Sequence, residues 1–66
     1  MTHITIGDLI IDDGGDAGIV SLIEPPTGGV DELYFILWTS GGLTGYTTAH
    51  LLKEIHRWTK NVRSTT

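Results

Sequence analysis

The sequence contains no cysteine, which excludes a disulfide framework and thiolate metal sites in this chain of 66 residues. There are two prolines but nine glycines, and this punctuation favours short strands over long helices. No apolar run approaches the ~20 residues of a membrane-spanning helix. The N-terminus also lacks the basic and apolar regions of a secretory signal. We therefore expect one small intracellular domain, residues 1–66, with no membrane segment.

Lysine and arginine are absent from positions 1–52, so the net charge of −4 is unevenly distributed. The C-terminal part carries Lys53, Arg57, Lys60 and Arg63 against one acid, Glu54. An acidic body with a basic end can direct different partners to different surfaces, although solvated loops and a solubilising tail have the same composition. The acids of the body are Asp8, Asp12, Asp13, Asp16, Glu24, Asp31 and Glu32.

Short apolar segments alternate with glycine-rich and proline-containing turns, a pattern typical of an antiparallel β-protein. The Asp12–Asp16 loop joins the first two segments, Glu24–Gly29 forms the next turn, and Ser40-Gly41-Gly42 indicates a tight hairpin. The predicted strands are residues 4–11, 18–23, 33–38 and 43–47.

Residues 48–62 fit two structures. Leu51, Ile55, Trp58 and Val62 have helical spacing, but no Glu or Gln occupies the capping-box position after Thr47 or Thr48. We favour a short 3₁₀ turn at residues 49–51, which includes His50, a fifth strand at 52–57 and a basic C-terminal tail at 57–66.

The segment Leu33–Trp38 is apolar on both faces. In a strand, Tyr34, Ile36 and Trp38 point to one side, whereas Leu33, Phe35 and Leu37 point to the other. A barrel interior covers one face only, so the second face is covered either by Trp58 and Val62 or by another molecule.

Five short strands with a 3₁₀ turn before the last predict an all-β, five-stranded SH3-like antiparallel barrel. Gly7-Asp8-Leu9-Ile10-Ile11 with Gly18-Ile19-Val20 resembles the KOW-like version of this barrel, in which a glycine permits the bend into the second strand. The segments 37–42 and 50–55 resemble later parts of small SH3-like proteins of tailed bacteriophages, over residues 4–57 in all. The resemblance implies a viral structural or accessory role, in the virion or the host cytoplasm.

The sequence predicts no enzyme and no cofactor. The acids of residues 12–24 do not follow EF-hand spacing, and His3, His50 and His56 do not follow a zinc spacing. No nucleophile elbow surrounds Ser21 or Ser40. The acidic loop would repel phosphate, which argues against nucleic-acid binding by the body but not by the basic tail.

Two sets of side chains are candidates for binding. Tyr34, Trp38 and Tyr46 would line an aromatic groove for a methylated cation or a proline-rich peptide, although core packing is the more frequent role of such residues. The candidate protein contacts are Leu33, Phe35, Leu37 and Trp58, with Asp12, Asp13 and Asp16 facing a basic partner.

Together these features predict a protein–protein assembly module whose partner is a second copy or a larger phage assembly. The alternative is a regulatory module that binds nucleic acid, or that inhibits a host nucleic-acid enzyme through its acidic face.

Overall fold

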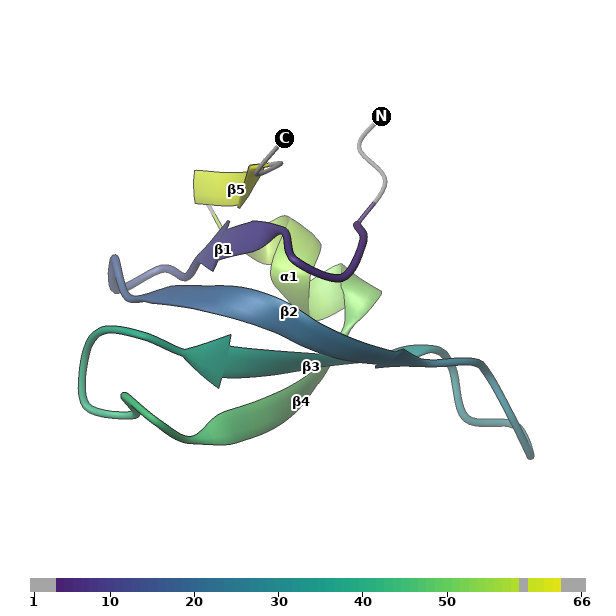
Figure 1. Cartoon of the computed structure of the whole chain (residues 1–66). Helices are drawn as coiled ribbons and strands as arrows, with labels where there is room; N and C mark the ends of the chain where they lie inside the picture. Colours follow the sequence, from purple (N-terminus) through teal and green to yellow (C-terminus); the bar gives the residue numbers. More distant parts are fainter. Residues whose placement is uncertain (1–3, 59, 64–66) are drawn as a thin grey trace.

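The computed structural model describes residues 4–58 and 60–63, the latter as backbone alone. This part of the chain is mostly β-structure with one short helix (Figure 1). The strands pair antiparallel in the order β4-β3-β2-β1-β5. Within the described residues no ladder joins β4 to β5, so the sheet is open. The elements are β1 (Leu9–Ile11), β2 (Ala17–Glu24), β3 (Leu33–Trp38), β4 (Thr47–Leu51), α1 (Leu52–Arg57) and β5 (Lys60–Arg63).

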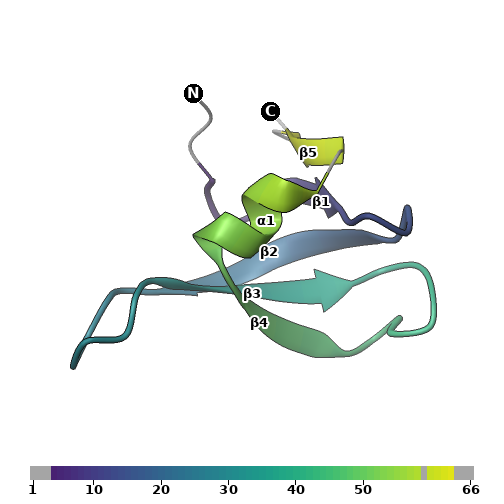
Figure 2. The same ribbon diagram turned by 180° about the vertical axis from the view of Figure 1, so that it is seen from behind.

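The core lies between one face of the sheet and helix α1, which covers that face in Figure 2. Alternation along β3 places Tyr34, Ile36 and Trp38 on one face, as the sequence predicts, and the structure shows that this is the buried face. From the helix, Ile55 is buried, and Leu52 and Trp58 pack against the same cluster. The buried apolar residues are Ile4, Ile10, Val20, Tyr34, Ile36, Trp38 and Ile55.

The first strand is shorter than predicted, because the chain turns before it. The Asp8 N–H donates to the Thr5 carbonyl over 3.1 Å, and Oδ2 of Asp8 accepts the Thr5 N–H at 2.9 Å. Gly7 has a φ of 97°, a conformation that L side chains rarely adopt. The prediction of a strand from residue 4 is therefore wrong, and β1 begins at Leu9.

The predicted fourth strand, residues 43–47, is also wrong, because most of it lies in a loop. Gly41 and Gly45 have φ values of 87° and 88°, and the Tyr46 N–H donates to the Leu43 carbonyl over 2.8 Å. The loop therefore continues past the tight turn predicted at Ser40-Gly41-Gly42, and pairing with β3 resumes at Tyr46. The predicted 3₁₀ turn at 49–51 is instead part of β4.

The predicted fifth strand, residues 52–57, is helix α1. The strand that follows it, β5, lies within the predicted tail and pairs with β1, with Leu9 opposite Arg63. The helix that the sequence allowed as the alternative for residues 48–62 therefore exists, although it ends at Arg57 and does not extend to Val62.

Candidate functional site

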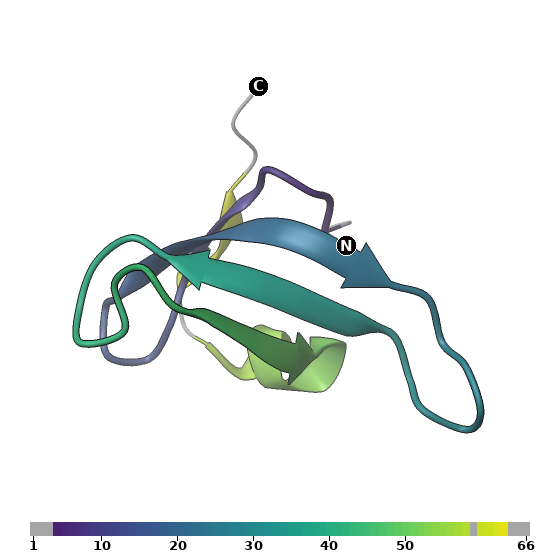
Figure 3. The same cartoon turned by 60° about the horizontal axis from the view of Figure 1, so that its bottom comes forward.

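The side of the sheet opposite α1 presents a nearly uncharged surface, which we call the outer face. Figure 3 shows β2, β3 and β4 side by side with no other element in front of them. The pairing registers place the side chains of this face in three rows across the strands. The rows are Ile19-Leu37-Thr47, Leu22-Phe35-Ala49 and Glu24-Leu33-Leu51.

Large apolar side chains of the outer face are in contact with solvent. Leu22, Leu37 and Ile19 are 47%, 39% and 37% exposed, whereas Leu33 and Phe35 are half-buried. The predicted second face of β3 is thus uncovered within the described residues. Contiguous apolar surface of this kind is typical of interaction sites.

A β-bulge places Leu22 on the outer face. The register shifts between Val20 and Leu22, so Ser21 is the extra residue, and its Oγ donates to the Phe35 carbonyl over 3.2 Å. Without the bulge, strict alternation would turn Leu22 inward with Val20. Sequence reasoning missed Leu22 and Ile19 because it considered the two faces of β3 alone.

Trp58 lies on the inner side of the sheet, so the structure does not place it with the other contact candidates. Its ring centroid is 6.0 Å from that of Trp38 and 5.3 Å from that of His50. The interpretation in which Trp58 covers the outer face is therefore wrong. The side chain of Val62, the other predicted cover, lies outside what the structure describes.

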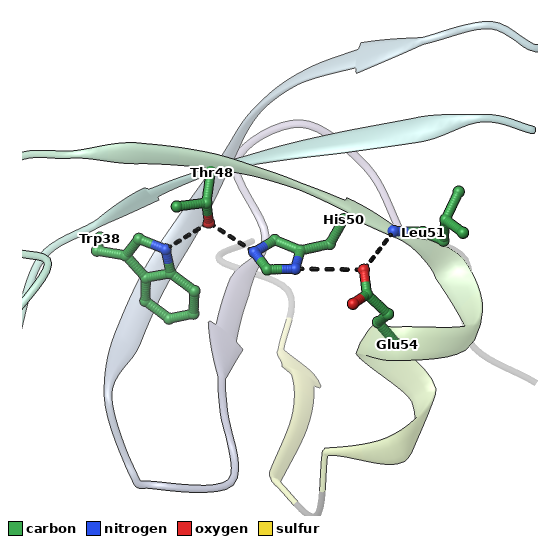
Figure 4. A network of polar contacts seen from close by, with 5 residues as sticks. All are labelled: Trp38, Thr48, His50, Leu51 and Glu54. Atoms are coloured by element: carbon green, nitrogen blue, oxygen red, sulfur yellow. Dashed lines mark hydrogen bonds and ion pairs between the residues drawn. The ribbon is translucent and has the colours of Figure 1, made fainter. Parts of the chain in front are cut away.

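A chain of polar contacts crosses the inner side from β3 to α1 (Figure 4). Nε1 of Trp38 donates to Oγ1 of Thr48 over 2.8 Å, and this oxygen lies 2.5 Å from Nε2 of His50. Nδ1 of His50 lies 3.4 Å from Oε1 of Glu54, which accepts the Leu51 N–H at 3.0 Å. With the His50 proton on Nδ1, the Thr48 hydroxyl donates to Nε2, and every group in the chain has a partner.

Thr48, His50 and Glu54 have the order hydroxyl, imidazole and carboxylate that activates a nucleophile in many hydrolases. Here the Thr48 oxygen already accepts the Trp38 indole N–H, and the residue is only partly exposed. The contacts join β3, β4 and α1, so we interpret them as a structural link. Sequence reasoning missed this link because it ended the fourth strand at Thr47, before the alternation of Thr48 and His50.

Glu54 also reduces the number of free backbone groups on β4, an edge strand of the sheet. The Trp38 N–H donates to the Tyr46 carbonyl, so alternation turns the backbone groups of Thr47, Ala49 and Leu51 away from β3. Because Glu54 occupies the Leu51 N–H, a partner strand would find free groups at Thr47 and Ala49 alone. This hydrogen bond, with a smaller contribution from His50, lowers the pKa of Glu54.

The acidic loop between β1 and β2 uses one of its carboxylates internally. Oδ1 of Asp12 accepts the N–H groups of Gly14 and Asp16, each over 2.9 Å. Such hydrogen bonds are the usual reason for aspartate in turns. Asp16 lies beside Gly41, where any Cβ would collide with its carboxylate. Of the three candidate acids, Asp13 is the exposed one, whereas Asp12 and Asp16 are half-buried.

The three candidate groove aromatics do not share a surface. Tyr34 and Trp38 are buried in the core, whereas Tyr46 is 66% exposed at the end of the β3–β4 loop. The Tyr34 hydroxyl donates to Oε1 of Glu32 over 2.5 Å. Burial, with this carboxylate as the second cause, raises the pKa of Tyr34 to about 12.

The described residues contain no group of three or more His, Asp or Glu side chains arranged to hold a metal ion. His56 is exposed on α1, and His3 lies outside the described residues. No described helix is long and apolar enough to cross a membrane. Comparisons with protein-family models, curated proteins and solved structures found no match.

Proposed function

We propose that this chain is a non-enzymatic assembly module that binds a second copy of itself through the outer face. The observation that carries the proposal is the exposed apolar surface of Ile19, Leu22 and Leu37 on the face of the sheet that no described element covers. A domain of this size buries a limited share of its surface alone, and association is a common source of additional stability.

The charge distribution allows a second copy to meet this chain at the outer face and at few other places. The body carries seven acids and no lysine or arginine up to position 52, so two copies repel each other over most of their surfaces. In the rows of the outer face Glu24 is the one charged residue, and it lies at a corner. Two copies can therefore meet face to face there with little electrostatic cost.

The fold proposed with this function is an SH3-like barrel of the kind found in small tailed-phage proteins, acting as a virion component or an accessory factor. The strand order β4-β3-β2-β1-β5 supports this proposal, as does the helical turn between β4 and β5. In a larger phage assembly, the outer face would make the same apolar contact with a further subunit.

The mass in solution, measured by light scattering across protein and salt concentration, tests this function. We expect a dimer of the 7.2 kDa chain whose mass does not fall as salt is added, because the contact is apolar and salt screens the repulsion between the two acidic bodies. Leu37→Lys should give a monomer, since it places a charge on the central strand β3 between Ile19 and Thr47 of the outer face.

Leu43→Lys is the matched control, because Leu43 is also exposed, at 48%, but lies in the β3–β4 loop and is not part of the paired rows of the outer face. It should remain dimeric. A wild-type protein that stays monomeric at high concentration would refute self-association, and so would equal dissociation by the two variants.

The regulatory alternative, an acidic surface that binds a host nucleic-acid enzyme, remains a prediction. The internal hydrogen bonds of Asp12 leave fewer free carboxylates on the loop than the sequence suggests. The outer face is therefore the better supported surface.

A further inference from the structure

A groove of about 370 Å³ opens between the β2–β3 loop and the start of α1. We call it the loop groove, and it lies next to the outer face because Leu51, which is paired with Leu33, belongs to both. Three apolar side chains and three charged ones line it. These are Pro26, Leu51 and Leu52 on the one hand and Asp31, Glu32 and Lys53 on the other.

The loop that forms one wall is held in shape by its own hydrogen bonds. Thr27 and Val30 exchange both backbone hydrogen bonds at 2.9 Å, and the residues between them, Gly28 and Gly29, have φ values of 56° and 82°. Positive φ at both central positions is the signature of a type I′ turn. Pro26 and Asp31 flank this turn, so the groove wall is ordered before any ligand binds.

The two carboxylates of the groove are not neutralised by its lysine. Among residues 4–58 no ion pair joins Lys53 to Asp31 or Glu32. Glu32 is half-buried, and the Tyr34 hydroxyl fixes its Oε1. Oε2 of Glu32 and the exposed Asp31 carboxylate can therefore accept further hydrogen bonds.

We propose that the loop groove binds a peptide segment of a partner protein in which an arginine stands between apolar residues. The planar guanidinium donates in two directions, so it can bind two carboxylates that line one groove, which a lysine ammonium does less well. The apolar neighbours of the arginine would contact Leu51, Leu52 and Pro26. This site goes beyond self-association, since it takes a different ligand in a groove beside the outer face.

Titration of the ¹⁵N-labelled protein with the peptide acetyl-Leu-Arg-Leu-amide, followed by NMR, tests the proposal. We expect the amide signals of Asp31, Leu52 and Lys53 to shift most. The same peptide with citrulline, which keeps the shape of arginine without its charge, should bind about tenfold more weakly, because two exposed ion pairs are lost.

Three variants make the test specific. Asp31→Asn should weaken binding of the arginine peptide about threefold, whereas Lys53→Gln should strengthen it about twofold by removing a like charge. Asp13→Asn removes the same charge from the β1–β2 loop and should have no effect. Leu37→Lys should bind the peptide like the wild type, which separates this site from the outer face.

Equal affinity for the arginine and citrulline peptides would overturn the proposal, as would shifts confined to other parts of the sheet or no shifts at all. An equal effect of Asp13→Asn and Asp31→Asn would show non-specific attraction to the acidic body and would also overturn it.

Discussion

Gly18 is the position at which the smallest possible change should cost the most stability. A Cβ at Gly18 would lie 2.5 Å from Cγ2 of Ile36, 2.9 Å from Cε3 of Trp38 and 3.1 Å from the Leu37 carbonyl oxygen. Carbon atoms in favourable contact are ~3.5–4.0 Å apart, so Gly18→Ala overlaps the core by about 1 Å. The neighbouring backbone of β3 cannot retreat without breaking the ladder.

We expect Gly18→Ala to lower the free energy of unfolding by about 3 kcal/mol, the upper end of ordinary overpacking costs. A domain of this length has a total stability of roughly 3–10 kcal/mol, so the variant loses a large part of it. Thermal unfolding followed by circular dichroism should show a midpoint lowered by roughly 12–24 °C.

Two further variants distinguish overlap from other effects. Ile36→Leu removes the Cγ2 methyl group that overlaps the Cβ introduced by Gly18→Ala. The double variant should therefore lose about 1 kcal/mol less free energy of unfolding than the two single variants lose together. Gly42→Ala is the control, because its Cβ meets nothing within 4 Å, and it should change stability by less than about 0.5 kcal/mol. If Gly18→Ala is as stable as Gly42→Ala, the close approach of β2 and β3 is refuted.

Three other outcomes follow from the polar contacts. Thr48→Val leaves the Trp38 indole N–H without its partner and should cost about 1–3 kcal/mol in urea unfolding, while Thr47→Val, on the outer side of β4, should stay within about 0.5 kcal/mol; equal losses would contradict the link. The Leu51 N–H lowers the pKa of Glu54 from its ordinary value of 4.5, so the ionised carboxylate stabilises the folded state at pH values above 4.5. This stability is lost as the pH falls below 4.5 and through the folded pKa, so the urea midpoint should fall over this range, and it should fall less in Glu54→Gln. Because the pKa of Tyr34 is raised to about 12, its contribution to stability is present below pH 10 and lost above it, and the Tyr34 step in absorbance at 295 nm should lie near pH 12 and vanish in Tyr34→Phe.

The two faces of β3 were predictable, because alternation over Leu33–Trp38 assigns every side chain to a side once a strand is assumed. The length of β2 was predicted to within a residue at each end, since Gly and Pro clusters bound it. The bulge at Ser21 was not predictable. It depends on the register against β3, and one extra residue changes the side on which Leu22 lies.

Helix α1 was assigned wrongly because its N-cap, Leu51, has no side chain that can accept a hydrogen bond. Glu54, three residues later, supplies the other half of a capping box by accepting the Leu51 N–H. The test for a capping box at Thr47 and Thr48 therefore examined the wrong positions. Tertiary packing of Ile55 on the sheet completes the stabilisation that a six-residue helix lacks on its own.

The role of Gly18 also could not be read from the sequence. A glycine at the beginning of the second strand suggested a bend, but its φ is not positive, and the residue is buried against Ile36 and Trp38. The constraint is space in the folded core. It appears only when two strands distant in the sequence are brought together, whereas the glycines with positive φ act locally.

The antiparallel pairing of β1 with β5 predicts the order in which the ladders of the sheet form. The other three ladders join strands that are neighbours in the chain, while this one joins Leu9 to Arg63. The loop it closes is roughly nine times longer than that between Ile11 and Ala17, which adds about 2 kcal/mol of entropic cost. We therefore expect the β1-β2-β3-β4 meander to form first and β5 to join last. In the native state β5 should open most often, uncovering the edge of β1 while the core over β2 and β3 stays closed.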